Sequence, residues 1–174
     1  MEYDTIQLKC PGESMNLFMG ELQRGFCMEA RAGTVYEFLA ETCRMSDEYI
    51  AEKIKTVFIN GGPVDDIYNT EIKEGDTCAV SGAMPGLVGA MMRMGSPYAS
   101  MRESITVKPG KSALSGRSIF VKLKLFNMVL SEKGPCFLAG GILLERERVN
   151  DLFVNHGGEI FPRCREVLIN GSAV

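Results

Sequence analysis

The side chains that most often carry catalysis are few in this chain and are not spaced for it. His156 is the only histidine, so a cysteine–histidine or serine–histidine pair would have to use it. It stands in Asn155-His156-Gly157-Gly158, which is typical of a polar turn after a helix. The adjacent carboxylates of Asp65-Asp66 point apart in a strand or turn, and we interpret them as solvated turn residues.

The cysteines do not predict a metal site or a disulfide framework. Cys-x-x-Cys pairs, which build zinc knuckles and iron–sulfur sites, do not occur in the sequence. Residues 1–10 lack the basic and apolar regions of a signal peptide, so we expect a cytoplasmic protein with reduced cysteines in its core. Glycine-rich phosphate loops are also missing, and no cofactor is expected. The six cysteines are Cys10, Cys27, Cys43, Cys78, Cys136 and Cys164.

Composition predicts one soluble domain or two small ones. The chain has 174 residues, of which 45% are apolar and 24% are charged, and it contains no apolar run of about 18 residues that could span a membrane. Residues 1–99 carry a net charge of −7 and residues 100–174 carry +4. This difference fits two solvated faces, or two units that dock on each other. The basic stretch over residues 102–124 lacks interleaved aromatics, so nucleic acid is not an expected partner.

The first half has the pattern of strands around one helix. Alternation predicts strands at Ile6–Lys9 and Gly25–Arg31. Thr34 and Glu37 form a capping box, which starts a helix whose apolar residues recur at helical spacing as far as Cys43. Further predicted elements are a helical turn at Ile50–Lys55, a strand at Lys55–Ile59, a turn at Asn60–Pro63 and a strand at Thr77–Val80.

Three segments of this half carry a family resemblance. Thr34–Leu39, Val57–Val64 and Thr70–Asp76 resemble, in order, motifs of the ubiquitin-like sulfur carriers, namely the molybdopterin-synthase small subunit and the thiamine-pathway carrier. The resemblance implies a β-grasp fold over about residues 25–86. Those carriers act through a C-terminal Gly-Gly carboxylate. Here the corresponding position after Val80 reads Ser81-Gly82-Ala83-Met84 and the chain continues, so we do not expect carrier activity.

The second half echoes the first. Ile119–Phe126 resembles the family's first strand, Glu132–Pro135 its hairpin turn and Phe137–Leu144 its second strand. Arg148–Phe153 resembles the start of the helix, and Val167–Val174 matches Val57–Val64 at five of eight positions. Chance recurrence of an apolar strand followed by Asn-Gly is the alternative. We therefore predict an α+β protein of two tandem β-grasp units, the second incomplete or circularly permuted, with Ser104–Lys108 or another molecule's strand filling its vacant position.

The domain boundaries follow from this division: a β-grasp domain at 1–83, a Met- and Gly-rich linker at 84–103, and a second unit at 104–174. Within Met84–Met101, residues Leu87–Met94 can form two turns of helix. Methionine gives a pliable packing surface, so this segment is either a linker between the halves, a subunit interface or a groove for a small ligand or peptide. Its candidate interface residues are Met84, Pro85, Gly86, Leu87, Met91, Met94 and Tyr98.

The function predicted is a non-catalytic binding or scaffold protein that contacts a protein partner or self-associates as a homo-oligomer. The alternative is a sulfur carrier in molybdopterin or thiamine biosynthesis, activated by processing or by a longer C-terminus. An enzyme built on cysteine or carboxylate side chains stays open as a third possibility.

Overall fold

The protein, seen here as a computed structural model, has its described residues at 2–9, 16–110 and 116–173. The strands are β1 (Tyr3–Lys9), β2 (Phe26–Arg31), β3 (Gly33–Thr34), β4 (Thr56–Ile59), β5 (Gly62–Val64), β6 (Glu71–Ile72), β7 (Thr77–Ser81), β8 (Ser118–Phe126), β9 (Ile142–Glu145), β10 (Glu166–Ile169) and β11 (Ser172–Ala173). The helices are α1 (Asn16–Arg24), α2 (Val35–Glu37), the π-helix η2 (Phe38–Thr42), α3 (Asp47–Lys53), α4 (Gly86–Met92), the 3₁₀ segment η3 (Ala99–Ile105), α5 (Asn127–Gly140) and α6 (Arg146–Arg163).

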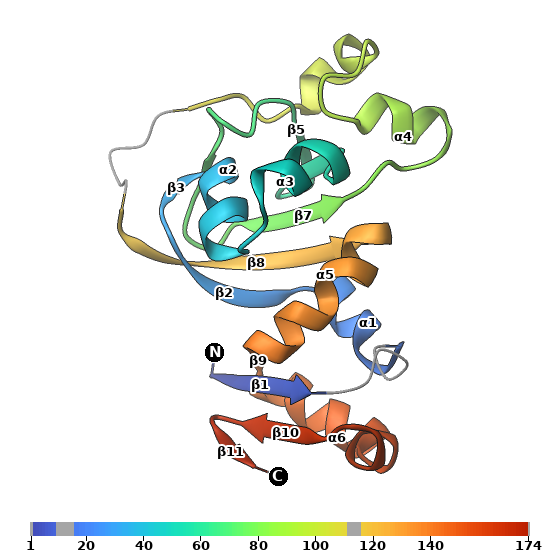
Figure 1. Cartoon of the computed structure of the whole chain (residues 1–174). Coiled ribbons are helices and arrows are strands. Elements are labelled where there is room, and N and C mark those ends of the chain that lie inside the picture. Colours follow the sequence, from blue (N-terminus) through green and yellow to red (C-terminus); the bar gives the residue numbers. More distant parts are fainter. Residues whose placement is uncertain (1, 10–15, 111–115, 174) are drawn as a thin grey trace.

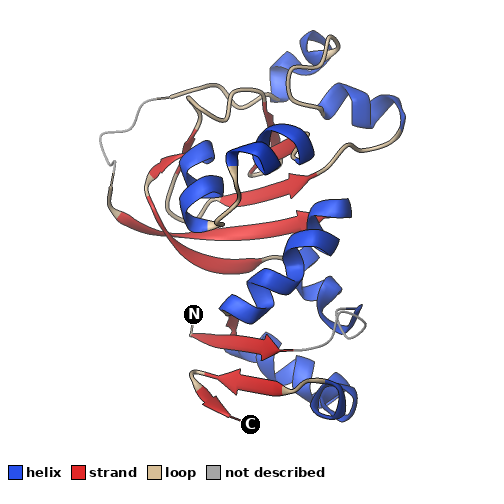
Figure 2. Cartoon of the chain, viewed as in Figure 1, coloured by secondary structure: helices blue, strands red, loops and turns tan. Residues whose placement is uncertain are grey.

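The predicted α+β class is confirmed. Among the described residues, nine strands form one mixed sheet in the order β11-β10-β1-β9-β2-β8-β7-β4-β5. Helices pack against this sheet, and a single hydrophobic core runs through the described chain (Figures 1 and 2). No helix in the described ranges is both long enough and apolar enough to cross a membrane.

The half of the sheet from β2 to β5 follows the sequence patterns closely. The Thr34 capping box forms as predicted, because its hydroxyl accepts the backbone N–H of Glu37 and the Glu37 carboxylate accepts that of Thr34. The helix then widens into η2, with Val35, Phe38 and Leu39 buried against the sheet. β8 completes this half, since it pairs antiparallel with β2 and parallel with β7.

The Asn60-Gly61 turn joins β4 to β5 through left-handed backbone. Asn60 has φ 51° and Gly61 has φ 85°, the pattern of a two-residue hairpin turn. The Asn60 side chain donates to the Asp76 carboxylate (2.7 Å) and accepts the Thr77 N–H (2.9 Å), while the Asn60 N–H donates to the Thr77 carbonyl (2.9 Å). The turn is thereby fixed to the start of β7.

The same set of bonds recurs at the Asn170-Gly171 turn between β10 and β11. Asn170 has φ 50°, donates through its side chain to Asp4 (2.9 Å) and accepts the Thr5 N–H (2.9 Å), and its own N–H donates to the Thr5 carbonyl (2.9 Å). The Asp4-Thr5 pair at the start of β1 therefore repeats the role of Asp76-Thr77. The similarity predicted between the two hairpins thus extends to a strand at the opposite end of the chain.

The strand expected at Ser104–Lys108 does not form, and that prediction is wrong. Residues 99–105 are η3, and the Val107 N–H donates to the Pro63 carbonyl (2.9 Å) beside β5. β1 instead lies between β10 and β9 and pairs antiparallel with both. The apolar side chains Ile6 and Leu8 of β1 are buried, and this burial stabilises β1 in the sheet.

The hairpin predicted at Glu132–Pro135 is also wrong, because these residues lie inside α5. Gly134-Pro135 is a turn signal, but the helix buries Val129, Leu130, Phe137 and Leu138. This packing outweighs the local preference. The expected strand Phe137–Leu144 therefore begins only at Ile142, after Gly141 has turned the chain at φ 98°.

The strand pairing does not follow the domain boundaries predicted from the sequence. β1, from the expected first domain, pairs with β9 and β10, whereas β8, from the expected second domain, pairs with β2 and β7. Residues 84–103 belong to the connection between β7 and β8, which are neighbours in the sheet, and project at the end of the molecule opposite β10 and β11 (Figure 1). Each half of the sheet thus takes one strand from the other half of the sequence.

Candidate interaction site

The segment 84–106, here called the arm, leaves the sheet after β7 and returns along β5. Its two helical pieces, α4 and η3, pack against each other and stand away from the sheet (Figure 1). Five large apolar side chains on the arm are exposed: Leu87 (66%), Val88 (66%), Tyr98 (45%), Met101 (67%) and Ile105 (52%). A concentration of exposed large apolar residues on one projecting segment is typical of an interaction surface.

A buried arginine fixes the arm to the body of the protein. Arg102 is 2% exposed, and its guanidinium makes two hydrogen bonds to the Asp65 carboxylate, at 2.6 and 3.1 Å. The remaining guanidinium N–H groups donate to the Thr106 hydroxyl (2.9 Å) and to the carbonyls of Met91 and Arg93 (3.1 Å for the latter). One cation thus joins α4, η3 and the end of β5, with a bidentate charge-assisted pair at its centre.

Two backbone contacts and one apolar side chain complete the attachment. The Met94 N–H donates to the Lys55 carbonyl and the Val107 N–H donates to the Pro63 carbonyl, both at 2.9 Å. The Met94 side chain packs on the core and lines a small cavity of about 310 Å³ together with Ile50 and Ile54. The arm is therefore held in a defined position, while its five exposed apolar side chains, here called its outer face, stay open to solvent.

The seven interface residues predicted from the sequence divide between the two faces of the arm. Leu87 and Tyr98 lie on the exposed face, and Pro85 and Gly86 are exposed at the entry to α4. Met84, Met91 and Met94 are half-buried. The helix expected over Leu87–Met94 ends at Met92, since Arg93 is extended, so Met94 turns to the core. Whether the set forms an interface stays a prediction.

Sequence reasoning missed five residues of this site. Val88, Met101 and Ile105 are exposed and apolar, but they are not among the candidate interface residues predicted from the sequence. Arg102 was grouped with a solvated basic stretch, and Asp65 was expected to be a solvated turn residue. Arg102 and Asp65 are 37 positions apart, so local sequence carried no signal for this ion pair.

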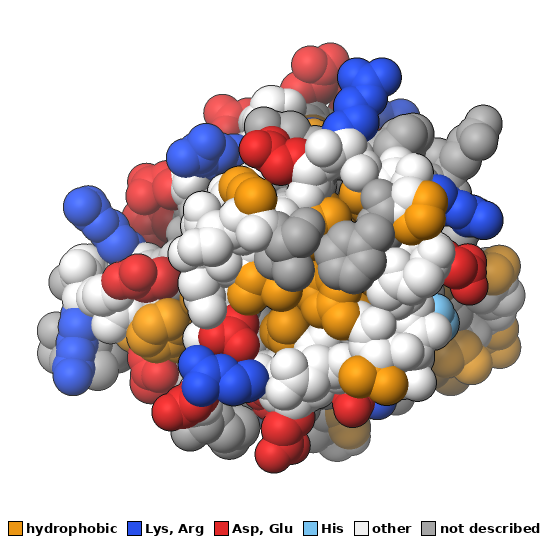
Figure 3. All heavy atoms as spheres, turned by 90° about the horizontal axis from the view of Figure 1, so that it is seen from below, with side chains coloured by type: hydrophobic (Ala, Val, Ile, Leu, Met, Phe, Trp, Pro, Cys, Tyr) orange, Lys and Arg blue, Asp and Glu red, His pale blue; other side chains and the backbone are white. Residues whose placement is uncertain are grey.

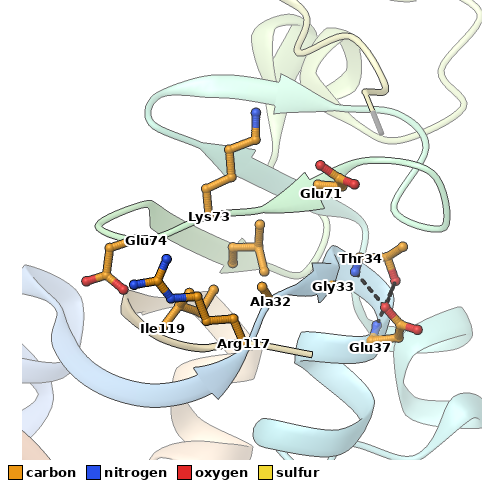
Figure 4. Close-up of a pocket in the computed structure, with 10 residues that line it drawn as sticks. Ala32, Gly33, Thr34, Glu37, Glu71, Lys73, Glu74, Arg117 and Ile119 are labelled. Carbon is orange, nitrogen blue, oxygen red and sulfur yellow. Dashed lines mark hydrogen bonds between the residues drawn. The ribbon is translucent and has the colours of Figure 1, made fainter. Parts of the chain in front are cut away.

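A second feature is a pocket of about 450 Å³ beside β3 and β6 (Figure 4). Its charged lining residues are Glu37, Glu71, Lys73, Glu74 and Arg117. Two of the carboxylates accept backbone hydrogen bonds: Glu37 caps the helix by accepting the Thr34 N–H, and Glu74 accepts the Phe120 N–H (2.9 Å). Arg117 follows closely in sequence after residues 111–115, which lie outside the described part of the chain, so we assign the pocket no ligand.

The other chemically capable side chains are dispersed. His156 lies exposed within α6, so the turn predicted there is wrong, and Gly157-Gly158 continues the helix. Cys27, Cys43 and Cys78 are buried and free as expected, whereas Cys136 is free but exposed. Cys164 is disulfide-bonded, which contradicts the expectation of reduced thiols. Cys10 lies outside the described residues.

Burial suppresses the reactivity of the core thiols. Desolvation raises the pKa of Cys78 to about 12, with Asp76 adding to the effect, and it raises the pKa of Cys43 as well. A hydrogen bond with Cys27, together with burial, raises the pKa of Tyr3 to about 12. These groups are neutral at physiological pH. Within the described residues, no group of three or more His, Cys, Asp or Glu side chains is arranged to hold a metal ion.

The surface at the other end of the molecule is mixed in character. Figure 3, viewed from below, shows apolar side chains near the centre of this face, with acidic and basic side chains around them. Comparison of the chain with protein-family models, curated proteins and solved structures finds no match. The arm therefore has to be interpreted from its own residues.

Proposed function

We propose that this protein is a non-catalytic, ubiquitin-like binding or scaffold protein that contacts a protein partner through the outer face of the arm. The observation that carries the proposal is the exposure of Leu87, Val88 and Met101 on a segment that the buried Arg102 holds in place. Covering a large apolar side chain is favourable by about 1.5–3 kcal/mol. A surface that is already ordered also loses less conformational entropy on binding.

The β-grasp part of the proposal is supported by strand order in the half from β2 to β5. In the family that the sequence resembles, a hairpin precedes the helix and the later strands. β8, antiparallel to β2 and parallel to β7, takes the place of the hairpin's first strand although it comes last in the sequence. On this interpretation the unit is circularly permuted, and the arm is the connection that the permutation requires.

The second unit of the proposal rests on the repeated bonding of Asn60 and Asn170. After β9 come a helix (α6) and two strands (β10 and β11), the same order as in the first unit. β1 lies beside β10 in the sheet, as β7 lies beside β4. Among the described residues this unit has no equivalent of β8, and β9 pairs directly with β1. On this interpretation the two units share one sheet and each is permuted.

The alternative function, a sulfur carrier, requires a free glycine carboxylate at the end of β7. Gly82 lies at that position and is buried, and the Ser81 carbonyl accepts the Lys55 N–H (3.0 Å). A Cβ on Gly82 would meet the Met128 side chain at 2.9 Å. Close packing therefore explains why this residue is glycine without a role as a carrier tail. These contacts favour the binding protein.

The proposal is tested with the protein isolated under mild conditions from the cells that make it. The double variant Leu87→Ser, Met101→Ser removes arm contacts, and Val154→Ser, at an 84% exposed apolar position on α6, is the matched control. We expect the wild type and the control to elute in one stoichiometric complex that the double variant fails to form. Equal complexes for all three proteins, or an intact mass fitting a glycine thiocarboxylate, would contradict the proposal.

A further inference from the structure

One strand in the middle of the sheet has an unused edge. β2 pairs along its whole length with β8, but its other side meets β9 only at Cys27, which lies opposite Leu143. Met28 to Ala32 therefore have no strand on that side among the described residues. The outer strand β5, in contrast, contains Pro63 and is covered by Val107. An open edge is a template for pairing with another strand.

The backbone groups that face this edge follow from the register. In an antiparallel pair, successive residues direct their N–H and C=O groups alternately to the two neighbours. The Ala32 N–H donates to the Arg117 carbonyl (2.7 Å), so Ala32, and with it Ala30 and Met28, face β8. Glu29 and Arg31 face the open edge, in step with Cys27, which faces β9. Both of their side chains are exposed.

The open edge borders a groove of about 810 Å³. One side of the groove is formed by consecutive residues of β2, from Met28 to Gly33, and the other by residues of the helix and its end, among them Glu41, Thr42 and Arg44. The groove lies on a different element from the arm, so an occupant here is independent of the arm's partner.

We propose that the open edge of β2 pairs antiparallel with β2 of a second copy of this chain, about a twofold axis at Ala30. This register places Glu29 opposite the partner's Arg31 and Arg31 opposite the partner's Glu29. Both are residues whose backbone groups face the edge, so the ladder gains two hydrogen-bonded residue pairs and two ion pairs. A register centred on Glu29 or Arg31 would bring like charges together instead.

The limits of the open stretch fit the same register. At one end β9 occupies the edge at Cys27, and at the other the chain leaves β2 at Gly33 to form β3. The segment Met28–Ala32 is centred on Ala30. In this register Gly33 of one copy, where the chain leaves β2, lies opposite Cys27 of the other copy, where β9 occupies the edge. The pairing is isologous and closes as a dimer in which the open stretch of β2 is used in both copies.

Charge reversal tests the register with the full chain. Glu29→Arg creates two Arg–Arg pairs and Arg31→Glu creates two Glu–Glu pairs, so each single variant should weaken the dimer about tenfold or more in sedimentation equilibrium. The double variant Glu29→Arg, Arg31→Glu restores opposite charges and should recover wild-type dimerisation. Glu159→Arg, an exposed change of the same charge on α6, is the control and should leave dimerisation unchanged. Thermal unfolding of every variant checks that the fold is intact.

Amide hydrogen exchange gives a second readout that does not depend on the charges. In the dimer, the N–H groups of Glu29 and Arg31 should become protected as protein concentration rises, whereas those of Met28 and Ala30 stay protected at all concentrations. A chain that remains monomeric at millimolar concentration overturns the proposal. A dimer that withstands both single reversals overturns it too, as does protection of Glu29 and Arg31 by a different protein rather than by a second copy.

Discussion

Replacing Arg102 by alanine should release the arm while the sheet stays folded. The substitution removes two hydrogen bonds to Asp65, one to the Thr106 hydroxyl and two to backbone carbonyls of the arm. Breaking a buried ion pair costs about 3–5 kcal/mol. The Asp65 side chain keeps 32% of its surface in solvent, so water compensates part of this loss, and we expect about 2–3 kcal/mol.

This loss of free energy increases the fraction of molecules in which the arm is detached from the body of the protein. A free energy of about 2–3 kcal/mol corresponds to a roughly 30- to 150-fold increase in the open population. The reporters are the N–H groups of Met94 and Val107, which donate to Lys55 and Pro63 outside the arm. Their exchange with deuterium should accelerate by that factor in Arg102→Ala, if they exchange through local opening.

The controls separate a local clamp from a general loss of stability. Arg93→Ala removes an exposed arginine from the same arm and should leave exchange of both amides unchanged. Amides of β7, which pair with β4 and β8, should keep their protection in Arg102→Ala. Exchange at Met94 and Val107 that stays within about threefold of wild type, or an equal loss of protection across β7, would refute the reasoning.

Three further predictions concern the hairpins and the core. Hydrogen bonds from Arg146 and then Asn170 lower the pKa of Asp4 from its ordinary value of 3.8, so its contribution to stability is complete above that value and is lost as pH falls through the lower, folded pKa; urea unfolding should show Asp4→Asn less stable than wild type at pH 7 and closer to it in acid. Asn60→Ala and Asn170→Ala should each cost about 1–2 kcal/mol in the same assay, because alanine disfavours positive φ and cannot make the side-chain bonds, and a loss at one site alone would contradict their equivalence. Cys78, with its pKa raised to about 12, should resist iodoacetamide in the native protein and react only after unfolding.

The features that the sequence predicted are those encoded by residues close together in it. The capping box needs Thr34 and Glu37, which are three residues apart, and the hairpin turns need Asn60-Gly61 and Asn170-Gly171. Alternation predicted β2, short apolar runs predicted β4 and β7, and the resemblance of Ile119–Phe126 to the family's first strand predicted β8. In each case the chemistry of a few neighbouring residues decides the backbone conformation.

The features that were missed depend on contacts between distant segments. β1 pairs with β10, and β8 pairs with β2, but periodicity gives a strand's face and not its neighbour. Gly134-Pro135 became helical because of the apolar stripe that α5 buries. Arg102 looks like a surface cation until Asp65, 37 positions earlier, approaches it. A family resemblance that assumes the ordinary strand order does not predict the circular permutation that we propose.

The most direct test of the proposed function is site-specific photo-crosslinking in the cells that make the protein. A photoreactive amino acid is placed at Leu87 on the arm and, separately, at Val154, which is equally apolar and more exposed but lies on α6. Our account predicts one discrete crosslinked protein from position 87 that is absent from position 154 and is lost when Met101→Ser is added. The same products from both positions, or none from position 87, would contradict the claim that the arm is the binding surface.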